Sequence, residues 1–290
     1  MERTPHIEIS QLTFTYATAE KPALKNINLT IYEGEYVALL GLNGAGKTTL
    51  LLTLNGVIPH MVMGDMEGVV TIAGRDTDAL PVRELAKVVG IVFDNPEFQL
   101  SQLTVAEEVA FGLENLGVPQ AQMHDIIHEV LGVVGLTGLH ERSPFALSGG
   151  QQQRLAIASA LVMRPQIFVM DEPTSNVDPI GKEEIFQVAR QLNQQHGMTV
   201  VISEHEVEVM AEYADRVIVL HEGEIVLNGH PREVFQQVKL LKEIGLRVPQ
   251  VTEMAYMLDT QGLWHAGDAY PITVAEALHV FAKYRKEYRI

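Results

Sequence analysis

The stretch Glu35-Tyr-Val-Ala-Leu-Leu-Gly-Leu-Asn-Gly-Ala-Gly-Lys-Thr-Thr49 decides the fold of this chain. Its first part, Tyr36–Leu40, is a short apolar run that is typical of a buried strand. The run ends at Gly41-Leu-Asn-Gly-Ala-Gly-Lys47-Thr48, which matches the P-loop spacing Gly-x-x-x-x-Gly-Lys followed by Ser or Thr. A helix is predicted to begin near Lys47 and to run through Leu54.

The residue types of this loop suit a phosphate. Its glycines let backbone N–H groups close on phosphate oxygens, and the new helix adds unpaired N–H groups and a positive dipole end. Lys47 can reach the β- and γ-phosphates, and the Thr48 hydroxyl can bind Mg²⁺. The predicted binding residues of this loop are Gly41, Asn43, Gly44, Ala45, Gly46, Lys47, Thr48 and Thr49.

Composition sets limits on the rest of the chain. Its 290 residues are 47% hydrophobic and 20% charged, which suits a globular protein of about two domains. The absence of cysteine excludes disulfides, thiolate metal sites and a thiol nucleophile. We expect no signal peptide, and no apolar run approaches the ~20 residues that span a bilayer. A net charge of −16 argues against a general affinity for nucleic acid or anionic lipid.

Strand and helix patterns alternate along the chain. Alternating or apolar β-branched runs predict strands at residues 7–16, 27–31, 68–73, 167–170, 199–202, 217–220 and 224–229. Helical patterns cover residues 104–112, 120–134, 181–194 and 206–213. Strands separated by helices indicate a parallel sheet that is covered by helices. Capping boxes are predicted at Thr104–Glu107 and Thr273–Glu276.

Two carboxylates follow a buried strand in Ile167-Phe-Val-Met-Asp171-Glu172. The carboxyl ends of parallel strands face the crevice in which α/β proteins bind ligands. Asp171 suits the acid that holds Mg²⁺ through water, and Glu172 suits the general base for water that attacks the γ-phosphate.

A second phosphate-seeking helix start is predicted at Leu147-Ser148-Gly149-Gly150-Gln151, ahead of a strong helix that runs to Met163. Ser148 suits the N-cap position, and the two glycines leave their N–H groups open. Beside the P-loop and Asp171-Glu172, this segment resembles the signature motif of the ATP-binding-cassette (ABC) ATPases. The resemblance covers residues 7 to about 230 and implies ATP and Mg²⁺ as cofactors.

The resemblance implies three further site residues. Tyr16 matches the aromatic residue that stacks on adenine, and His205 matches the switch histidine that contacts the γ-phosphate. Residues 174–178 resemble the D-loop, which ends at Asp178. Together with Lys47 and Glu172, His205 is expected to be catalytic, and Ser148, Gly149, Gly150, Gln151 and Asp178 are expected to bind nucleotide.

One position departs from the family. Where ABC ATPases carry the Q-loop glutamine, this chain has Asp94. An ionised aspartate only accepts hydrogen bonds and would repel the γ-phosphate, although it can bind a water on Mg²⁺. Gln99 lies five residues later and is the alternative candidate, so both are kept as possible metal-site residues.

The expected fold is therefore α/β: a P-loop NTPase (RecA-like) core with an antiparallel β lobe and a helical subdomain at about 97–165. The ATPase domain would span residues 1–229. A small, mainly helical C-terminal extension would span residues 230–290 and steady a dimer.

The stretch Val92–Pro119 is similar to ABC ATPases of the energy-coupling-factor (ECF) type, which power import of vitamins or of cobalt and nickel. That similarity implies a peripheral protein on the cytoplasmic face of the cell membrane. It implies a head-to-tail dimer with a second ATPase subunit, either the same chain or a paralogue. It also implies an integral membrane coupling protein and a substrate-capturing membrane protein, with no nucleic-acid partner. Candidate acids for a basic residue of the coupling protein are Glu97, Glu107 and Glu108.

Two other functions are compatible with the motifs. One is a soluble ABC ATPase that acts on nucleic acid or ribosomes, although only about 100 residues, without heptads, separate Lys47 from Ser148. The other is a regulatory subunit with an impaired site, which Asp94 favours and the presence of Lys47 and Glu172 disfavours.

Overall fold

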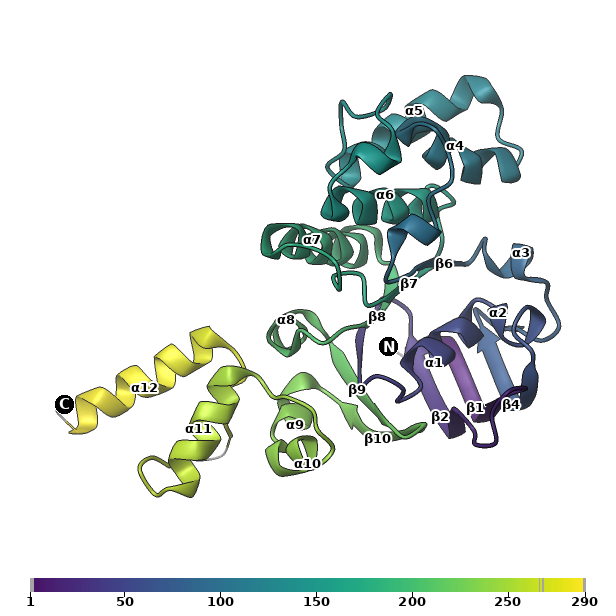
Figure 1. Cartoon of the computed structure of the whole chain (residues 1–290). Coiled ribbons are helices and arrows are strands. Elements are labelled where there is room, and N and C mark those ends of the chain that lie inside the picture. Colours follow the sequence, from purple (N-terminus) through teal and green to yellow (C-terminus); the bar gives the residue numbers. More distant parts are fainter. Residues whose placement is uncertain (1–2, 266, 268, 289–290) are drawn as a thin grey trace.

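Two β-sheets form the centre of the computed structural model, which describes residues 3–265, 267 and 269–288 (Figure 1). The larger sheet has the order β10-β9-β3-β8-β7-β6, and its strands from β9 to β6 are mutually parallel. Its strands are β3 (Tyr36–Leu40), β6 (Val89–Val92), β7 (Ile167–Asp171), β8 (Thr199–Ser203), β9 (Arg216–His221) and β10 (Glu224–Gly229). The predicted hairpin is present, because β10 pairs antiparallel with β9.

The smaller sheet is antiparallel and has the order β2-β1-β4-β5. Its strands are β1 (Pro5–Tyr16), β2 (Leu24–Tyr32), β4 (Gly64–Ile72) and β5 (Arg75–Asp76). Strand β1 ends at Tyr16, which pairs with Gly64 at the start of β4. This sheet is the antiparallel lobe that the sequence predicts.

The strand residues of the larger sheet alternate between two hydrophobic cores, as the two faces of a pleated strand require. In β3, Tyr36, Ala38 and Leu40 join the core under the helices, whereas Val37 and Leu39 join the core shared with the antiparallel sheet. Strand β7 divides in the same way, so every residue of both strands is buried. This explains why their sequences read as continuous apolar runs.

Helices cover both cores. Helix α1 (Lys47–Leu54) buries Leu50, Leu51 and Leu54 in the core that the two sheets share. The other core is covered by α4 (Val105–Asn115), α5 (Gln120–Val133), α6 (Gly149–Leu161), α7 (Pro179–His196) and α8 (Val207–Tyr213). Short helices α2 (Val57–His60), α3 (Val82–Leu85), η1 (Pro96–Phe98) and η2 (Pro144–Ala146) lie in the connections. Helices α4, α5 and α6 stand together at one end of the molecule (Figure 1).

In the described residues after β10 the chain forms the helices α9 (Pro231–Phe235), α10 (Val238–Glu243), α11 (Gln250–Thr260) and α12 (Val274–Tyr288). Phe235 and Leu241 are buried in the same core as the ATPase strands, whereas α11 and α12 project away from the sheets (Figure 1). The division into residues 1–229 and 230–290 stays a proposal, and α9 and α10 pack as a continuation of the first part.

Local sequence signals and structure agree at most helix starts. Thr104 and Ser148 each form a capping box, with Glu107 and Gln151 respectively. At Thr273 only half of the predicted box forms: its hydroxyl accepts from the Glu276 N–H, but the Glu276 carboxylate accepts from the N–H of Ile272. Strand β4 begins four residues earlier than predicted, and β6 was not predicted as a strand.

Candidate active site

A cavity of about 750 Å³ opens where strands β3, β7 and β6 end and β1 approaches them. Parallel strands place their carboxyl ends on one edge, so loops that are far apart in sequence meet there. Eleven of the predicted residues line it: Tyr16, Asn43, Gly44, Gly46, Lys47, Thr48, Thr49, Asp94, Gln99, Asp171 and Glu172. Ala23, Phe93 and Phe98 complete the lining and were not singled out from the sequence.

The glycines of the P-loop allow neighbouring backbone segments to pack directly against the loop. Gly46 has a φ of 105°, and a side chain at this position would meet the Ala23 carbonyl oxygen at 2.7 Å. At Gly41 a side chain would meet the Leu220 carbonyl oxygen at 2.6 Å. Gly41 therefore packs against β9 and does not itself line the cavity, while Gly44 and Gly46 do.

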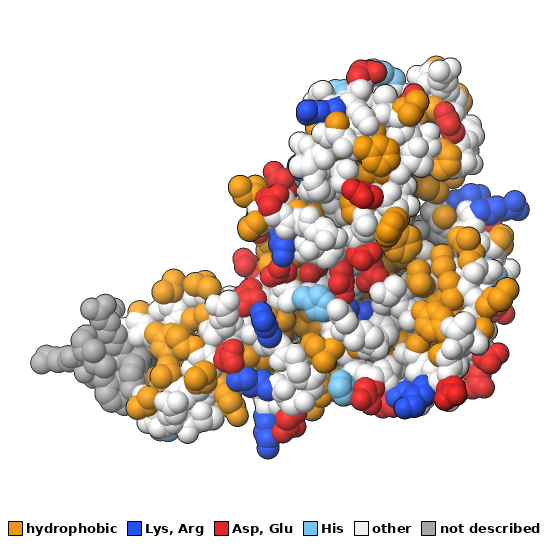
Figure 2. All heavy atoms as spheres, viewed as in Figure 1, with side chains coloured by type: hydrophobic (Ala, Val, Ile, Leu, Met, Phe, Trp, Pro, Cys, Tyr) orange, Lys and Arg blue, Asp and Glu red, His pale blue; other side chains and the backbone are white. Residues whose placement is uncertain are grey.

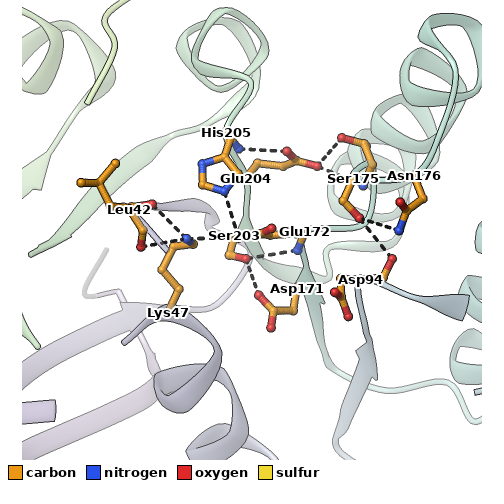
Figure 3. Close-up of polar contacts among 12 residues, drawn as sticks. Leu42, Lys47, Asp94, Asp171, Glu172, Ser175, Asn176, Ser203, Glu204 and His205 are labelled. Carbon is orange, nitrogen blue, oxygen red and sulfur yellow. Dashed lines mark hydrogen bonds and ion pairs between the residues drawn. The ribbon is translucent and has the colours of Figure 1, made fainter. Parts of the chain in front are cut away.

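Lys47 is almost fully buried, and its ammonium group has three oxygen partners. Nζ donates to the Gly41 carbonyl at 2.9 Å and to the Leu42 carbonyl at 3.4 Å. It also lies 3.1 Å from Oε1 of Glu172, which directly follows β7, the next strand but one in the sheet (Figure 3). A buried ammonium group needs such partners, and the same geometry suits phosphate oxygens.

Glu172 also contacts the switch histidine. Oε1 of Glu172 lies 3.0 Å from Nε2 of His205, which follows β8 (Figure 3). The backbone of Glu172 has a φ of 46°, a left-handed conformation that is uncommon for a residue with a side chain. Its N–H donates to the carbonyl oxygen of Ser203 at 3.0 Å and to the Ser203 hydroxyl at 3.1 Å. The backbone of the candidate base is thus held by Ser203 of the neighbouring strand β8.

Asp171 and Thr48 are the residues that the sequence predicts to hold Mg²⁺, and both line the cavity. Asp171 is buried, and one of its carboxylate oxygens accepts the Ser203 hydroxyl proton, which fixes the side chain toward the cavity. Within the described residues no group of three His, Asp or Glu side chains could hold a metal alone. The donor set fits an ion that takes its remaining ligands from phosphate and water, and such an ion would neutralise phosphate charge.

Tyr16 is held beside the P-loop helix. Its hydroxyl lies 2.8 Å from the Thr49 hydroxyl, and its ring packs edge-on against Phe14 at 4.9 Å between centroids. One face of the aromatic side chain is therefore fixed at the cavity wall, where a base could stack on it.

The Q-loop position is occupied by Asp94, which is exposed on the cavity wall. The alternative candidate, Gln99, also lines the cavity, but both ends of its amide are engaged. Its Oε1 accepts from the Phe93 N–H at 3.1 Å, and its Nε2 donates to the Ile91 carbonyl at 3.1 Å. Gln99 therefore clamps its own loop, and Asp94 has the freer side chain.

The signature helix α6 begins outside this cavity. Gly149 lines a separate cavity of about 410 Å³ with Asn176 and Val177. Asp178 is also outside the nucleotide cavity and caps α7, accepting the N–H groups of Ile180 and Gly181. Inside the same chain, residues 148–151 and Asp178 are thus not brought together with Lys47.

A side chain of α6 nevertheless contacts the Q-loop segment. Gln153 is fully buried, and its Nε2 donates to the Phe93 carbonyl at 3.0 Å, one residue before Asp94. Sequence reasoning did not identify Gln153, Ser203 or Glu204, because each acts through a contact between segments that are distant in sequence.

One candidate partner residue is wrong. Glu108 is buried, and its carboxylate accepts the N–H groups of Ser101 at 2.7 Å and Gln102 at 2.8 Å. It holds the turn before α4 and is not accessible to a partner. Glu107 is exposed but serves the α4 capping box, while Glu97 is exposed.

Comparison with known proteins places this geometry in a family. The ABC transporter family profile matches residues 24–175. A putative ABC transporter ATP-binding protein of Pyrococcus abyssi is 44% identical over 257 residues, which are 89% of this chain and 92% of that protein. The energy-coupling factor transporter ATP-binding protein EcfA1 of Clostridium novyi is 40% identical over 270 residues, 92% of this chain and 94% of that protein.

Solved structures agree with these relatives. CbiO1 of Clostridium perfringens, described as part of the ABC transporter complex cbiONQ, has a TM-score of 0.74 at 32% identity. The match covers 87% of this chain and 99% of that chain. A dimeric ATP-binding cassette in a post-hydrolysis state with ADP and Pi has a TM-score of 0.68 at 33% identity, covering 78% of this chain and 99% of that one.

The fold and the cavity at its strand ends are those of an ATP-binding cassette. The chain belongs to the ABC transporter ATP-binding proteins and is an ATPase, the ATP-binding subunit of a transporter. None of the helices in its described part has the length and apolar character needed to cross a bilayer.

Proposed function

We propose that this chain powers an ECF-type importer for a vitamin or for cobalt or nickel ions. The observation that carries the proposal is the 40% identity to EcfA1 over nearly the full length of both chains. The likeness to CbiO1 supports the same subfamily. The chain would sit on the cytoplasmic face of the cell membrane with a membrane coupling protein and a substrate-capturing membrane protein, and without a nucleic-acid partner.

The surface around η1 and α4 supports a membrane-protein partner. Phe98 is 89% exposed and Leu103 is 80% exposed, and Phe111 on α4 is 48% exposed. Exposed apolar side chains are typical of protein interaction surfaces when several gather on one part of the surface. Figure 2 shows apolar side chains over this end of the molecule. Because Phe98 also lines the nucleotide cavity, a partner bound here would lie next to the site of hydrolysis.

We propose a head-to-tail dimer in which each ATP, with Mg²⁺, is bound by Lys47 of one protomer and by residues 148–150 of the other. Two helix starts that both favour anions should stay apart until a polyphosphate neutralises them. In this chain they open into different cavities, which supports a second protomer as the source of the signature helix. The solved cassette of similar fold is dimeric and bound to ADP and Pi, which supports a dimer of this chain.

The C-terminal extension would add to this dimer. Met254 and Met257 on α11 are 44% and 49% exposed, and Val274 and Leu278 on α12 are 63% and 68% exposed. These exposed apolar side chains on α11 and α12 are candidates for burial against a second copy.

The experiment is purification of the tagged chain from membranes, followed by mass-spectrometric identification of the integral proteins that accompany it. We expect a coupling protein and a substrate-capturing protein in stable ratio with the ATPase. Leu103→Ser with Phe111→Ser should release them while ATP binding is retained, and Leu263→Ser, on an exposed apolar residue after α11, is the matched control. Recovery with ribosomes or DNA instead of membrane proteins would refute the import function.

A further inference from the structure

A buried carboxylate connects two loops of the active site. Glu204 is 3% exposed and lies between β8 and His205. Its Oε1 accepts the Thr174 N–H at 3.1 Å and also the Thr174 hydroxyl, and its Oε2 accepts the His205 N–H at 2.9 Å (Figure 3). One side chain therefore fastens the loop after Glu172 to the loop of the switch histidine.

Burial of the Glu204 carboxylate carries a desolvation cost. Moving a carboxylate out of water is unfavourable, and burial raises the pKa of the Glu204 carboxyl. A serine or threonine could bond one of these loops with less desolvation. A glutamate offers two oxygens at the end of a longer side chain, and here each oxygen serves a different loop.

The loop that Glu204 holds contains a strained residue. Glu172 has a φ of 46°, and Pro173 and Thr174 follow it directly. The Ser203 hydroxyl accepts the backbone N–H of Glu172, and the Glu204 carboxylate accepts the backbone N–H of Thr174, two residues later. A backbone conformation of this kind persists only where its surroundings fix it. His205, whose backbone Glu204 also holds, contacts the Glu172 carboxylate at 3.0 Å and closes the ring of contacts.

We propose that Glu204 is a positioning residue for ATP hydrolysis: it fastens the Thr174 loop to His205 and so holds Glu172 between Lys47 and His205. The inference rests on the proposed roles of Glu172 and His205. Glu204 itself does not line the nucleotide cavity and need not contact the nucleotide.

The test compares Glu204→Gln with two changes at its partner, Thr174→Val and Thr174→Ser. Glutamine has nearly the same shape, but its NH₂ group would face a backbone N–H and leave donors unpaired. We expect kcat to fall about tenfold in Glu204→Gln and in Thr174→Val, because a small displacement of a catalytic group is costly. KM and the affinity for a slowly hydrolysed ATP analogue should be unchanged. Thr174→Ser keeps the hydroxyl and should hydrolyse ATP at the parent rate.

The double variant Glu204→Gln/Thr174→Val should be slowed by less than the product of the single effects, since both break one connection. A wild-type kcat in Glu204→Gln overturns the inference, and so does equal slowing by Thr174→Ser and Thr174→Val. If melting shows that Glu204→Gln does not fold, the threonine pair decides. Glu172→Gln and His205→Ala are measured in parallel: normal hydrolysis by both would refute their roles, a result that does not depend on Glu204.

Discussion

The Glu172 carboxylate lies 3.1 Å from the Lys47 ammonium group, although the two residues are 125 positions apart in the sequence. The Lys47 side chain is 4% exposed, so the carboxylate is the negative charge that balances its ammonium group. A bound triphosphate would compete for the same cation. Nucleotide binding would then release the carboxylate toward water, which is the position that a general base requires.

Glu172→Gln should bind ATP and dimerise, but hydrolyse it at least about 100-fold more slowly than the parent chain. The amide cannot take a proton, and it also competes less for Lys47. Phosphate release measures the rate, and size-exclusion chromatography with ATP measures the dimer. Glu114→Gln, on an exposed position of α4, is the control and should behave as the parent. Hydrolysis near the normal rate in Glu172→Gln would exclude Glu172 as the base.

Lys47→Ala and Ser148→Arg should each abolish hydrolysis, and mixing the two variants should restore about a quarter of the activity. Half of the randomly mixed dimers contain one chain of each kind, and each such dimer has one intact head-to-tail site. The measurement is ATPase activity at several mixing ratios. If hydrolysis required only groups of one chain, mixing would restore nothing.

Tyr16→Ala should lower the affinity for ATP about tenfold, whereas Tyr16→Phe should stay within about twofold of the parent. The ring supplies the stacking surface, and the hydroxyl contact with Thr49 only orients it. Fluorescence titration with a labelled ATP analogue measures both affinities. Equal loss in the two variants would assign the contribution to the hydroxyl, contrary to the stacking role.

Asp94→Gln should raise the affinity for ATP by roughly threefold, because it removes a negative charge from the wall of a cavity that takes a polyphosphate. Glu97→Gln removes the same charge from the same loop, but Glu97 lines the neighbouring cavity instead. It is therefore the matched control and should change the affinity less. A lower affinity in Asp94→Gln would indicate that the aspartate itself holds the metal.

Glu204 should make stability depend on pH. Burial is the main cause that raises its pKa above the ordinary value of 4.5. The folded chain then keeps a proton that the unfolded chain has lost, so this contribution to stability falls as pH rises from about 4.5 through the raised pKa. Urea unfolding of the parent chain and of Glu204→Gln measures it. The free energy of unfolding of the parent minus that of the variant should decrease across this range, and a rising difference would contradict the burial effect.

Much of the fold follows from local sequence. Residues 36–49 predict a strand, a phosphate loop and a helix, and all three are present. The caps at Thr104 and Ser148 form because Ser and Thr three residues before Glu or Gln satisfy helix N–H groups locally. Strand β6 has only four residues, and its pairing with β7 determines it more than its own pattern does.

From the residues alone, the site was predictable where a residue acts through its own loop, and Tyr16 and His205 were predicted only through the family resemblance. Lys47 and Asp171 belong to short patterns, so their places could be read from spacing alone. Ser203 and Glu204 act on Glu172 and Thr174, and that contact exists only because β7 and β8 are neighbours. Glu108 misled for the same reason: a charged residue in a helical pattern suggests an exposed face, but the N–H groups of Ser101 and Gln102 bind its carboxylate inside the protein.

The bond from Gln153 to the Phe93 carbonyl has a consequence for the proposed dimer. The bond connects the loop at Phe93 and Asp94, which lies beside a protomer's own nucleotide cavity, to helix α6. In the proposed dimer, the start of α6 would bind the nucleotide of the other protomer. If the proposed dimer forms, we expect ATP binding at one site to change the affinity of the other, so turnover should rise with ATP concentration more steeply than a simple hyperbola.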